Sequence, residues 1–411
     1  MTRLRIFISA YACEPGLGSE IGVGWHWVLE MSKYFDLWVL TRESNRNTIE
    51  PWIADHPQFA NIHFLYFDLP KWARFWKKGL RGVRTYYNIW QMCTNSIVRR
   101  TMKANDIKIF HHLTYGNAIW RVSSYGRHQF FVWGPIGGLE TIPKDFSSHY
   151  QGKLKILETV RRMMVKFLPL NLGFRKRCKC ADVILCKTDL TRQQIPEQYR
   201  SKAVLFTDVA VDSAEIDTNA RATVDNVVNL LSVGRLDAWR GFDLAIEALS
   251  KALKRNDSLL LTIVGKGQDL ERLQSLTRNL GIADKVEFAG KLSMEDYKAR
   301  LAQCDAVVNA SLKEGAVTVS FDSMTYGKPL ICLDTTGYTR YFNDDYSVVI
   351  PITNRAQTIE ELSKAMVAVC DSQMRIWLGE NARKAGKAFS WEKRGVEIRD
   401  LIEKSYNSKT E

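Results

Sequence analysis

Short apolar runs rich in β-branched residues alternate along the whole chain with segments of helical periodicity. In the first half, such runs occupy residues 4–9, 37–40, 62–67, 107–112, 129–133, 181–186 and 203–206. In the second half, they occupy residues 227–233, 259–265, 285–290, 305–310, 329–334 and 347–352. This alternation is typical of parallel strands covered by helices, and it predicts an α/β protein.

The chain divides into two such series. Its 411 residues exceed the size at which a single hydrophobic core stops growing. Residues 208–226 are polar and without periodicity, so we place the junction there. We predict two tandem Rossmann-like, doubly wound domains, 1–210 and 227–385, and a C-terminal helix within 386–411 that packs back on the first domain. Ligands of such sheets bind beyond the carboxyl ends of the strands, so we expect the domains to face a cleft.

The composition is that of an ordinary globular protein, with 45% hydrophobic and 25% charged residues. The sequence contains no uninterrupted apolar run of the roughly 18 residues that a membrane span needs. The opening MTRLRIFISAYACEPG lacks a small-residue cleavage site, and we interpret it as a buried strand rather than a signal peptide. We therefore expect a cytoplasmic protein.

The eight cysteines lie mostly inside apolar runs, without C-x-x-C spacing, so we expect reduced and packed thiols. The closest pair, Cys178 and Cys180, has a ligand type that metals bind, but no second Cys or His pair accompanies it. We interpret this pair as structural, and we predict neither a metal site nor another cofactor.

The positive charge is confined to the first half of the chain. Residues 1–210 hold 31 Lys and Arg against 16 Asp and Glu, whereas residues 211–411 hold 27 against 29. Within the first half, residues 71–100 carry eight basic and no acidic residues, and 153–179 carry nine basic residues against Glu158 alone. Both stretches are interleaved with aromatic or aliphatic side chains. Such stretches suit an anionic membrane surface, although solvated helix faces explain either one equally well.

The first loop of the second domain favours a diphosphate ligand. In SVGRLDAWRGFDLAIEAL, residues 232–249, a strand runs into Gly234, and a helix with one apolar face follows Gly241. The free N–H groups at the start of that helix favour an anion. The forked guanidinium donors of Arg235 and Arg240 suit phosphate oxygens in particular. Two solvated surface arginines are the alternative.

Two later segments have weaker signals of the same kind. VGKG at 264–267 also follows a strand, but it lacks the third glycine of a dinucleotide fingerprint and on its own is a plain turn. In SLKEGAVTVSFDSMTYGKPLI, residues 311–331, Glu314 follows a strand and Asp322 lies on the next short helix. Both carboxylates can face one ligand. Ordinary surface charge is the alternative.

Together, these segments resemble the retaining family-4 glycosyltransferases of the GT-B fold. The resemblance rests on GRLDAWRG, where Arg240 stands at the place of the usual lysine, on VGKGQDLERLQSLTRNLGIADKVEFAGKLSMEDYKARLAQCDAVVNASLKEG, and on an E-x7-E motif present as Glu314 and Asp322. It extends to YACEPGLGSEIGVGW at 11–25, WGPIGGLE at 133–140 and FSWEKRGVEI at 389–398. It covers most of the chain and is densest over 228–333.

The resemblance implies a metal-independent, hexosyltransferase-type enzyme that moves a sugar from a nucleoside-diphosphate sugar to an acceptor hydroxyl. It implies that Arg235 and Arg240 hold the donor diphosphate and that Asp322 bonds the ribose. Glu314 would hold the sugar hydroxyls. The other donor contacts that it implies come largely from backbone, at Gly234, Gly265, Lys291, Leu292, Gly315, Ala316 and Val317. No protein nucleophile is assigned, because the leaving phosphate itself helps to take the acceptor proton.

Two departures from the family pattern bear on sugar preference or activity. Asp322 is one methylene shorter than the usual glutamate. Ala316 and Val317 replace the common aromatic-glycine pair, and valine at 317 tolerates close approach of a phosphate less well than glycine does.

The first domain offers further candidates. Gly16 and Gly18, in the turn after the first strand, are predicted donor-binding residues, because they would let backbone amides approach the ligand, although a plain flexible loop is the alternative. HHLTYG at 111–116 ends another strand, and by the resemblance one of its histidines bonds the transferred sugar. We favour His112 over His111, while a structural role remains the alternative for each.

The basic stretches of the first domain favour a lipid-linked acceptor or polysaccharide precursor at the cytoplasmic face of the membrane. Two other classes of protein remain open. One is a sugar-nucleotide epimerase of the same fold. The other is a basic nucleic-acid-binding protein, although no nucleic-acid motif is present and we expect no nucleic-acid partner. A sugar-nucleotide-binding protein without turnover is a further alternative.

Overall fold

The computed structural model describes residues 3–77, 82–123, 126, 129–147, 152–212, 227–314, 317–335 and 340–410. Contacts within the chain separate two compact units. Unit 1 comprises Met1–Leu139, Met164–Asp208 and Trp391–Glu411, and unit 2 comprises Glu140–Met163 and Val209–Ser390. The chain thus passes between the units more than once.

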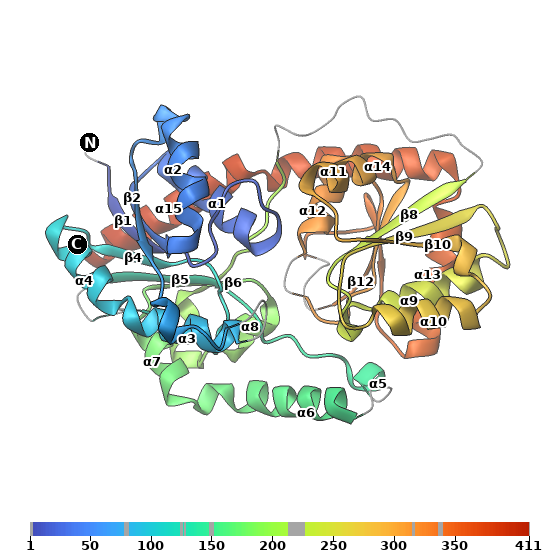
Figure 1. Cartoon of the computed structure of the whole chain (residues 1–411), viewed down its shortest axis with the longest axis horizontal. Helices are drawn as coiled ribbons and strands as arrows, with labels where there is room; N and C mark the ends of the chain where they lie inside the picture. Colours follow the sequence, from blue (N-terminus) through green and yellow to red (C-terminus); the bar gives the residue numbers. More distant parts are fainter. Residues whose placement is uncertain are drawn as a thin grey trace. The chain divides into compact units, whose positions relative to one another are not determined.

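Unit 1 is built on a seven-stranded parallel sheet of order β3-β2-β1-β4-β5-β6-β7. Its strands are β1 (Arg5–Ser9), β2 (Asp36–Arg42), β3 (Ile62–Phe67), β4 (Ile109–His112), β5 (Phe130–Ile136), β6 (Val183–Cys186) and β7 (Ala203–Leu205). Helices α1 (Ser19–Ser32), α2 (Arg46–Ala54) and α15 (Trp391–Thr410) cover one face, and α3 (Val83–Cys93), α4 (Asn95–Ala104) and α7 (Leu172–Cys180) cover the other (Figure 1). The short α8 (Asp189–Gln194) joins β6 to β7.

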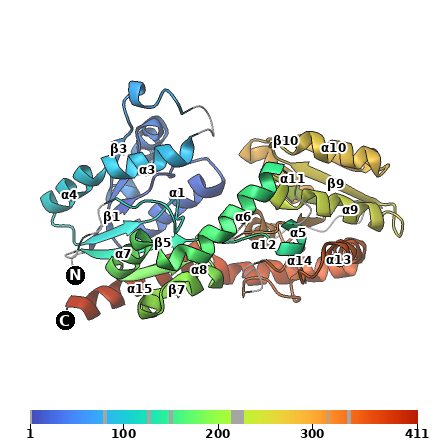
Figure 2. The ribbon, with the colours of Figure 1, turned by 90° about the horizontal axis from the view of Figure 1, so that it is seen from below.

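Unit 2 is built on a six-stranded parallel sheet of order β10-β9-β8-β11-β12-β13. Its strands are β8 (Val228–Val233), β9 (Leu259–Val264), β10 (Val286–Gly290), β11 (Ala306–Asn309), β12 (Leu330–Leu333) and β13 (Ser347–Ile350). Its helices are α5 (Lys144–Ser147), α9 (Phe242–Ala252), α10 (Leu270–Asn279), α11 (Met294–Gln303), α12 (Thr318–Thr325), α13 (Arg355–Ala368) and α14 (Ser372–Gly386). Figure 2 shows α9 beside β9 and α10 beside β10.

These two sheets confirm the predicted α/β fold class. Every predicted apolar run overlaps a strand, and in both sheets the first strand lies between the second and the fourth, as in doubly wound Rossmann-like folds. The order reverses between β1 and β4 in unit 1 and between β8 and β11 in unit 2. Ligands of such sheets bind beyond the carboxyl ends of the strands at this reversal, so the loops after these strands position any site.

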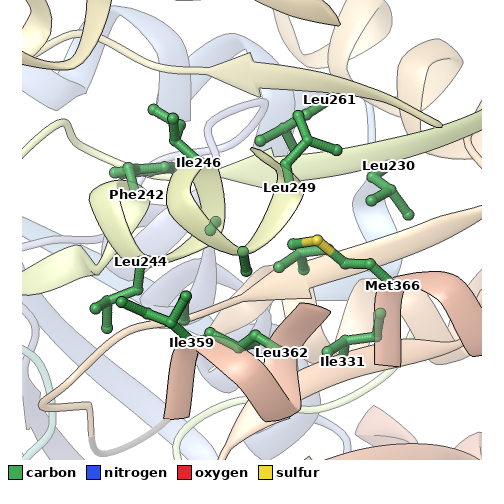
Figure 3. Packing of buried hydrophobic residues seen from close by; sticks show 14 of the residues in the cluster. Leu230, Phe242, Leu244, Ile246, Leu249, Leu261, Ile331, Ile359, Leu362 and Met366 are labelled. Carbon is green, nitrogen blue, oxygen red and sulfur yellow. The ribbon is translucent and has the colours of Figure 1, made fainter. Parts of the chain in front are cut away.

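Helix α9 shows why the loop after β8 is rigid. Phe242, Ile246 and Leu249 recur at helical spacing, are at most 3% exposed and belong to the core of unit 2. Leu244, on another side of the helix, is buried as well, because α13 packs against α9. Figure 3 shows these side chains together with Leu230, Leu261, Ile331, Ile359, Leu362 and Met366. Each fully buried large aliphatic side chain contributes about 1.5–3 kcal/mol, so the start of α9 is firmly held.

One segment lies in a different unit from the one predicted, whereas the C-terminal helix packs with the first unit, as predicted. Residues Glu140–Met163 pack with unit 2, because Ile142 and Phe146 join its core. The predicted C-terminal helix packs with unit 1 from Trp391 onward, and the Trp391 ring stacks on His26 with centroids 5.1 Å apart. Most of the predicted junction, residues 213–226, lies outside the described residues.

Candidate functional site

The carboxyl edge of unit 2 brings Arg240 and Glu314 together. Arg240 lies in the loop after β8, and Glu314 lies in the loop after β11, so the two loops flank the reversal of strand order. Their side chains form an ion pair, and both are largely buried, at 21% and 10% exposure. The Arg240 guanidinium carbon also lies 4.5 Å from the centroid of the Trp239 ring. A cation held this way is oriented before any ligand arrives.

Close backbone packing fixes the neighbouring turns. The N–H of Gly234 donates to the carbonyl of Val264 at 2.9 Å, and the N–H of Gly265 donates to the carbonyl of Gly290 at 2.8 Å. A side chain at Gly265 would overlap the carbonyl oxygen of Gly234. Gly241 has φ of 69°, a left-handed conformation that favours glycine, and a side chain there would overlap the carbonyl oxygen of Ala310. These contacts hold the loops after β8, β9 and β10 against one another, and Gly241 packs against the segment after β11.

The two predicted phosphate-binding arginines differ in their surroundings. The Arg235 side chain is 53% exposed, and its Nε donates to Asp237 Oδ2 at 2.5 Å. Arg240 is mostly buried beside Trp239, as described above. Arg240 is thus the more firmly positioned cation, because the Arg235 guanidinium is about half exposed and ion pairs of exposed side chains are weak.

A second ion pair supports the loop that contains Glu314. Its two residues, Lys313 and Glu158, are not among the predicted site residues. Lys313 Nζ lies 2.7 Å from Glu158 Oε2, and this carboxylate is 6% exposed. Glu158 Oε1 accepts a hydrogen bond from the backbone N–H of Ile142 at 2.9 Å. Helix α6 (Gly152–Phe167), which supplies Glu158, therefore anchors the residue preceding Glu314. In the sequence, Glu158 stands out only as the single acidic residue of the basic stretch 153–179.

The predicted ribose ligand, Asp322, is held by a buried tyrosine on another helix. The hydroxyl of Tyr297, on α11, donates to Asp322 Oδ2 at 2.7 Å. Burial and the Asp322 carboxylate raise the pKa of Tyr297 well above its ordinary value, so the hydroxyl stays protonated and keeps donating. No sequence motif marked Tyr297.

The remaining predicted donor contacts are distributed along the same edge. Lys291 is exposed and Leu292 is half-buried directly after β10, and Val317 is buried immediately before α12. Gly315 and Ala316 lie outside the described residues. The strands before Gly234, Gly265, Lys291 and Glu314 are neighbours in one parallel sheet, so their carboxyl ends gather these predicted residues at one edge.

In unit 1, both histidines of β4 are buried rather than open. His111 Nε2 lies 2.7 Å from the carbonyl oxygen of Gly134, and His112 Nε2 lies 3.0 Å from the hydroxyl of Tyr87. Burial lowers the pKa of His111 to about 4. It lowers that of His112 to about 3, helped by the charges of His111 and Arg177. Both rings are neutral at pH 7, and the buried Nδ1 of His112 has no hydrogen-bond partner among the described residues.

The turn after β1 contains the two predicted glycines, and the helix that follows supplies Glu20, which was not predicted. Gly16 has φ of 72°, and Gly18 precedes the first residue of α1 in an extended conformation. Glu20 Oε1 accepts a hydrogen bond from the backbone N–H of Tyr115 at 2.7 Å. Burial raises the pKa of Glu20, and the Asp208 charge adds to this, while Lys187 acts in the opposite sense. The loops after β1 and β4 are therefore tied together at the reversal of strand order in unit 1.

Comparison with known proteins identifies relatives of this arrangement. Residues 215–385 match the family Glycosyl transferases group 1. An uncharacterized glycosyltransferase of Methanocaldococcus jannaschii is 29% identical over 63% of this chain and 65% of its own length. The lipopolysaccharide core biosynthesis glycosyltransferase LpsE of Rhizobium meliloti is 28% identical over 43% of this chain and 48% of its own length. The chain thus matches less than two thirds of the length of either relative.

Solved structures share the fold over nearly the whole chain. WaaG, a glycosyltransferase involved in lipopolysaccharide biosynthesis, superposes with a TM-score of 0.62 at 16% identity, covering 97% of this chain and 99% of its own. Anabaena HepE in complex with UDP and glucose superposes with a TM-score of 0.61 at 14% identity, covering 98% and 100%. At these identities the likeness concerns the fold. It shows that the chain has the GT-B fold of these glycosyltransferases, while the sequence match to Glycosyl transferases group 1 concerns residues 215–385.

Proposed function

We propose that this protein transfers a sugar from a nucleoside-diphosphate sugar to an acceptor hydroxyl, with retention of the anomeric configuration. The observation that carries the proposal is the ion pair of Arg240 and Glu314 at the strand-order reversal of unit 2. It places a cation suited to phosphate beside a carboxylate suited to sugar hydroxyls. A sugar diphosphate presents those two kinds of group side by side.

Stabilisation of the leaving diphosphate falls to the arginines in this proposal. Charge develops on the diphosphate as the glycosidic bond breaks, and guanidinium groups fixed beforehand stabilise that charge without a metal ion. Arg240, held by Trp239 and Glu314, is oriented in advance, and Arg235 turns from Asp237 to the phosphate.

The remaining donor contacts follow from position along the same edge. Asp322, aligned by Tyr297, accepts from the ribose hydroxyls, and backbone near Gly265, Lys291 and Leu292 holds the base. Glu314 accepts from hydroxyls of the sugar. Support for UDP as the first nucleotide to test comes from HepE, which was crystallised with UDP and glucose.

The proton of the acceptor hydroxyl passes to the leaving phosphate oxygen as the new bond forms, so the mechanism needs no protein nucleophile. His112 is neutral, and its imidazole bonds the transferred sugar as a neutral partner rather than as an acid. Because the ring is buried, this contact requires the side chains around it to open toward the substrate.

We further propose that α6 docks the enzyme on an anionic membrane at the cytoplasmic face, where a lipid-linked or polysaccharide-precursor acceptor is presented. Most of the apolar side chains on this helix are exposed, and Val165 is a buried exception. Its buried side holds Glu158, and Arg162 donates to the carbonyl of Ile142 at 3.0 Å. Its exposed residues include seven apolar side chains, with exposures of 49–65% for Leu154, Ile156, Leu157, Val160, Met163, Met164 and Phe167. An apolar stripe beside basic residues suits the interface of an anionic bilayer.

A thermal-shift screen with UDP, GDP, ADP and their sugars tests the donor part of the proposal. The correct nucleotide raises the melting temperature, because it binds the folded state alone. Replacing both Arg235 and Arg240 by alanine abolishes the shift. Product analysis with and without acceptors then separates transfer, which needs an acceptor, from epimerisation, which rearranges the donor alone. A shift that survives both replacements contradicts the assignment of the donor site.

A further inference from the structure

Charged groups surround two buried tyrosine rings at the carboxyl edge of unit 1. Arg42 is the last residue of β2, Asp68 directly follows β3, and Tyr11 follows β1, and these three strands are neighbours in the sheet. The guanidinium carbon of Arg42 lies 5.2 Å from the centroid of the Tyr11 ring. The Tyr11 and Tyr86 rings are in turn 6.5 Å apart, and both are at most 2% exposed.

Two further cations approach the same rings from the segment after β3. Lys77 Nζ lies 4.6 Å from the centroid of the Tyr86 ring, and Arg74 Nη1 lies 3.4 Å from Asp68 Oδ2. Asp68 also accepts a hydrogen bond from the Tyr86 hydroxyl at 2.6 Å. We call Arg42, Arg74 and Lys77, with Asp68 among them, the unit 1 cation cluster.

The positive charge of this cluster exceeds what Asp68 neutralises. Burial lowers the pKa of Lys77, and the charges of Arg42 and Arg74 lower it further, against the opposing charge of Asp68. Arg42 Nε is buried and makes no hydrogen bond to the described residues. Three cations beside one carboxylate leave two positive charges and a donor in need of an acceptor. A phosphate group, which is anionic and has free acceptor oxygens for charge-assisted hydrogen bonds, complements both.

We propose that the unit 1 cation cluster binds a phosphate group of the acceptor. This inference rests on the proposed function, because it names the chemical class of the substrate that receives the sugar. The cluster lies close to the predicted sugar contact. The Tyr11 ring is 5.2 Å from that of Tyr87, whose hydroxyl lies 3.0 Å from His112 Nε2.

Phosphate is common to a lipid-linked acceptor and to a soluble sugar phosphate. Trp72 and Phe75, on the same segment as Arg74, are 78% and 76% exposed. These side chains offer apolar surface next to the phosphate ligands, which favours an acceptor whose phosphate carries a lipid chain.

Titration with inorganic phosphate tests the proposal. The host is the full chain carrying Arg235→Ala and Arg240→Ala, so that the donor site does not bind the probe. Calorimetry is expected to show at least tenfold weaker phosphate binding after Arg42→Gln. The same loss is expected after Lys77→Met, a second variant that keeps the test valid if Arg42→Gln fails to fold. Lys103→Ala, an exposed lysine on α4, is the matched control and leaves the affinity unchanged. Unchanged affinity in both cluster variants overturns the proposal.

Competition then separates the two sources of phosphate. Glucose 6-phosphate, and separately a prenyl phosphate in detergent, is titrated in competition with bound inorganic phosphate, and glucose serves as the neutral control. Stronger competition by either compound than by inorganic phosphate supports the cluster as an acceptor site and identifies the source. Competition by neither overturns it. UDP binding to the chain with its arginines intact is measured separately, so failure of the donor assignment is distinguishable from failure of this inference.

Discussion

Arg240 and Glu314, contributed by loops after adjacent strands, neutralise each other at the edge where unit 2 is proposed to bind its donor. A ligand diphosphate therefore competes with, or adds to, an existing carboxylate partner. The binding free energy of the phosphate therefore depends on the difference between the Arg240–phosphate interaction and the Arg240–Glu314 interaction.

Arg240→Ala should weaken UDP or the nucleotide selected by screening by about ten- to a hundredfold, since charge-assisted hydrogen bonds contribute about 1.5–3 kcal/mol. Arg235→Ala should have a smaller effect, because the Arg235 side chain is 53% exposed and paired with Asp237. Calorimetric titration of both variants measures the difference. An Arg235 effect equal to or larger than the Arg240 effect contradicts this ranking. Arg278→Ala on the exposed face of α10 is the control.

Glu314→Gln should lower kcat more than it changes nucleotide affinity. The amide keeps the size of the side chain but removes the charge opposite Arg240, so the guanidinium remains available to phosphate while its orientation loosens. Steady-state kinetics together with nucleotide titration separate the two effects. A variant that loses nucleotide binding and keeps its kcat would show that Glu314 serves only to position Arg240.

Tyr297→Phe should raise the KM for the donor severalfold and leave kcat nearly unchanged. Removal of the hydroxyl deprives Asp322 of a hydrogen bond of 2.7 Å that fixes the carboxylate. The expected cost in stability is about 1 kcal/mol, as for other single hydrogen bonds. Chemical denaturation and donor-dependent kinetics measure the two quantities. If Asp322→Asn gives the same KM as wild type, Asp322 does not contact the donor.

Serine at both Ile156 and Leu157 should weaken binding to phosphatidylglycerol vesicles at least fivefold without lowering the melting temperature, because both side chains are more than 60% exposed. Vesicle flotation measures the effect. Leu280→Ser, a partly exposed leucine next to α10, is the matched control. Wild-type protein that stays wholly unbound at low salt would refute the docking role of α6.

The buried histidines should make the protein less stable as the pH falls below about 6.5. Their pKa values in the folded chain, about 4 for His111 and about 3 for His112, lie below the unfolded value. The unfolded chain therefore binds more protons between these values, and stability present above pH 6.5 is lost on acidification, by about 1.4 kcal/mol per pH unit for each histidine. Urea unfolding at pH 7 and pH 5 measures the slope. His112→Asn should lessen the loss, and an unchanged slope would contradict this account.

The strands and helices with regular hydrophobic patterns were predictable, because the spacing of apolar residues and the content of β-branched residues reflect which side chains are buried. Each apolar run became a strand of two parallel sheets, and the helix after Gly241 formed with its predicted apolar face. The second buried side of α9, at Leu244, was not predicted, because it depends on α13, which is distant in the sequence.

The candidate site was predictable where loops follow strands, since chain order places Gly234, Arg240 and Glu314 at one sheet edge. Its supporting partners were not. Tyr297 reaches Asp322 from a separate helix, and Lys313 meets Glu158 from a segment that precedes unit 2's sheet. Such pairs form only once the layers have packed, and a single sequence carries no local signal for them.

Helix α15 returns the last described residues of the chain to unit 1, where Ile398 and Ile402 are at most 1% exposed. During synthesis on the ribosome, unit 1 therefore cannot be completed by α15 until all of unit 2 has been synthesised. A gene truncated at the junction would yield an incomplete N-terminal half, and the two halves are better studied by point substitution than by dissection.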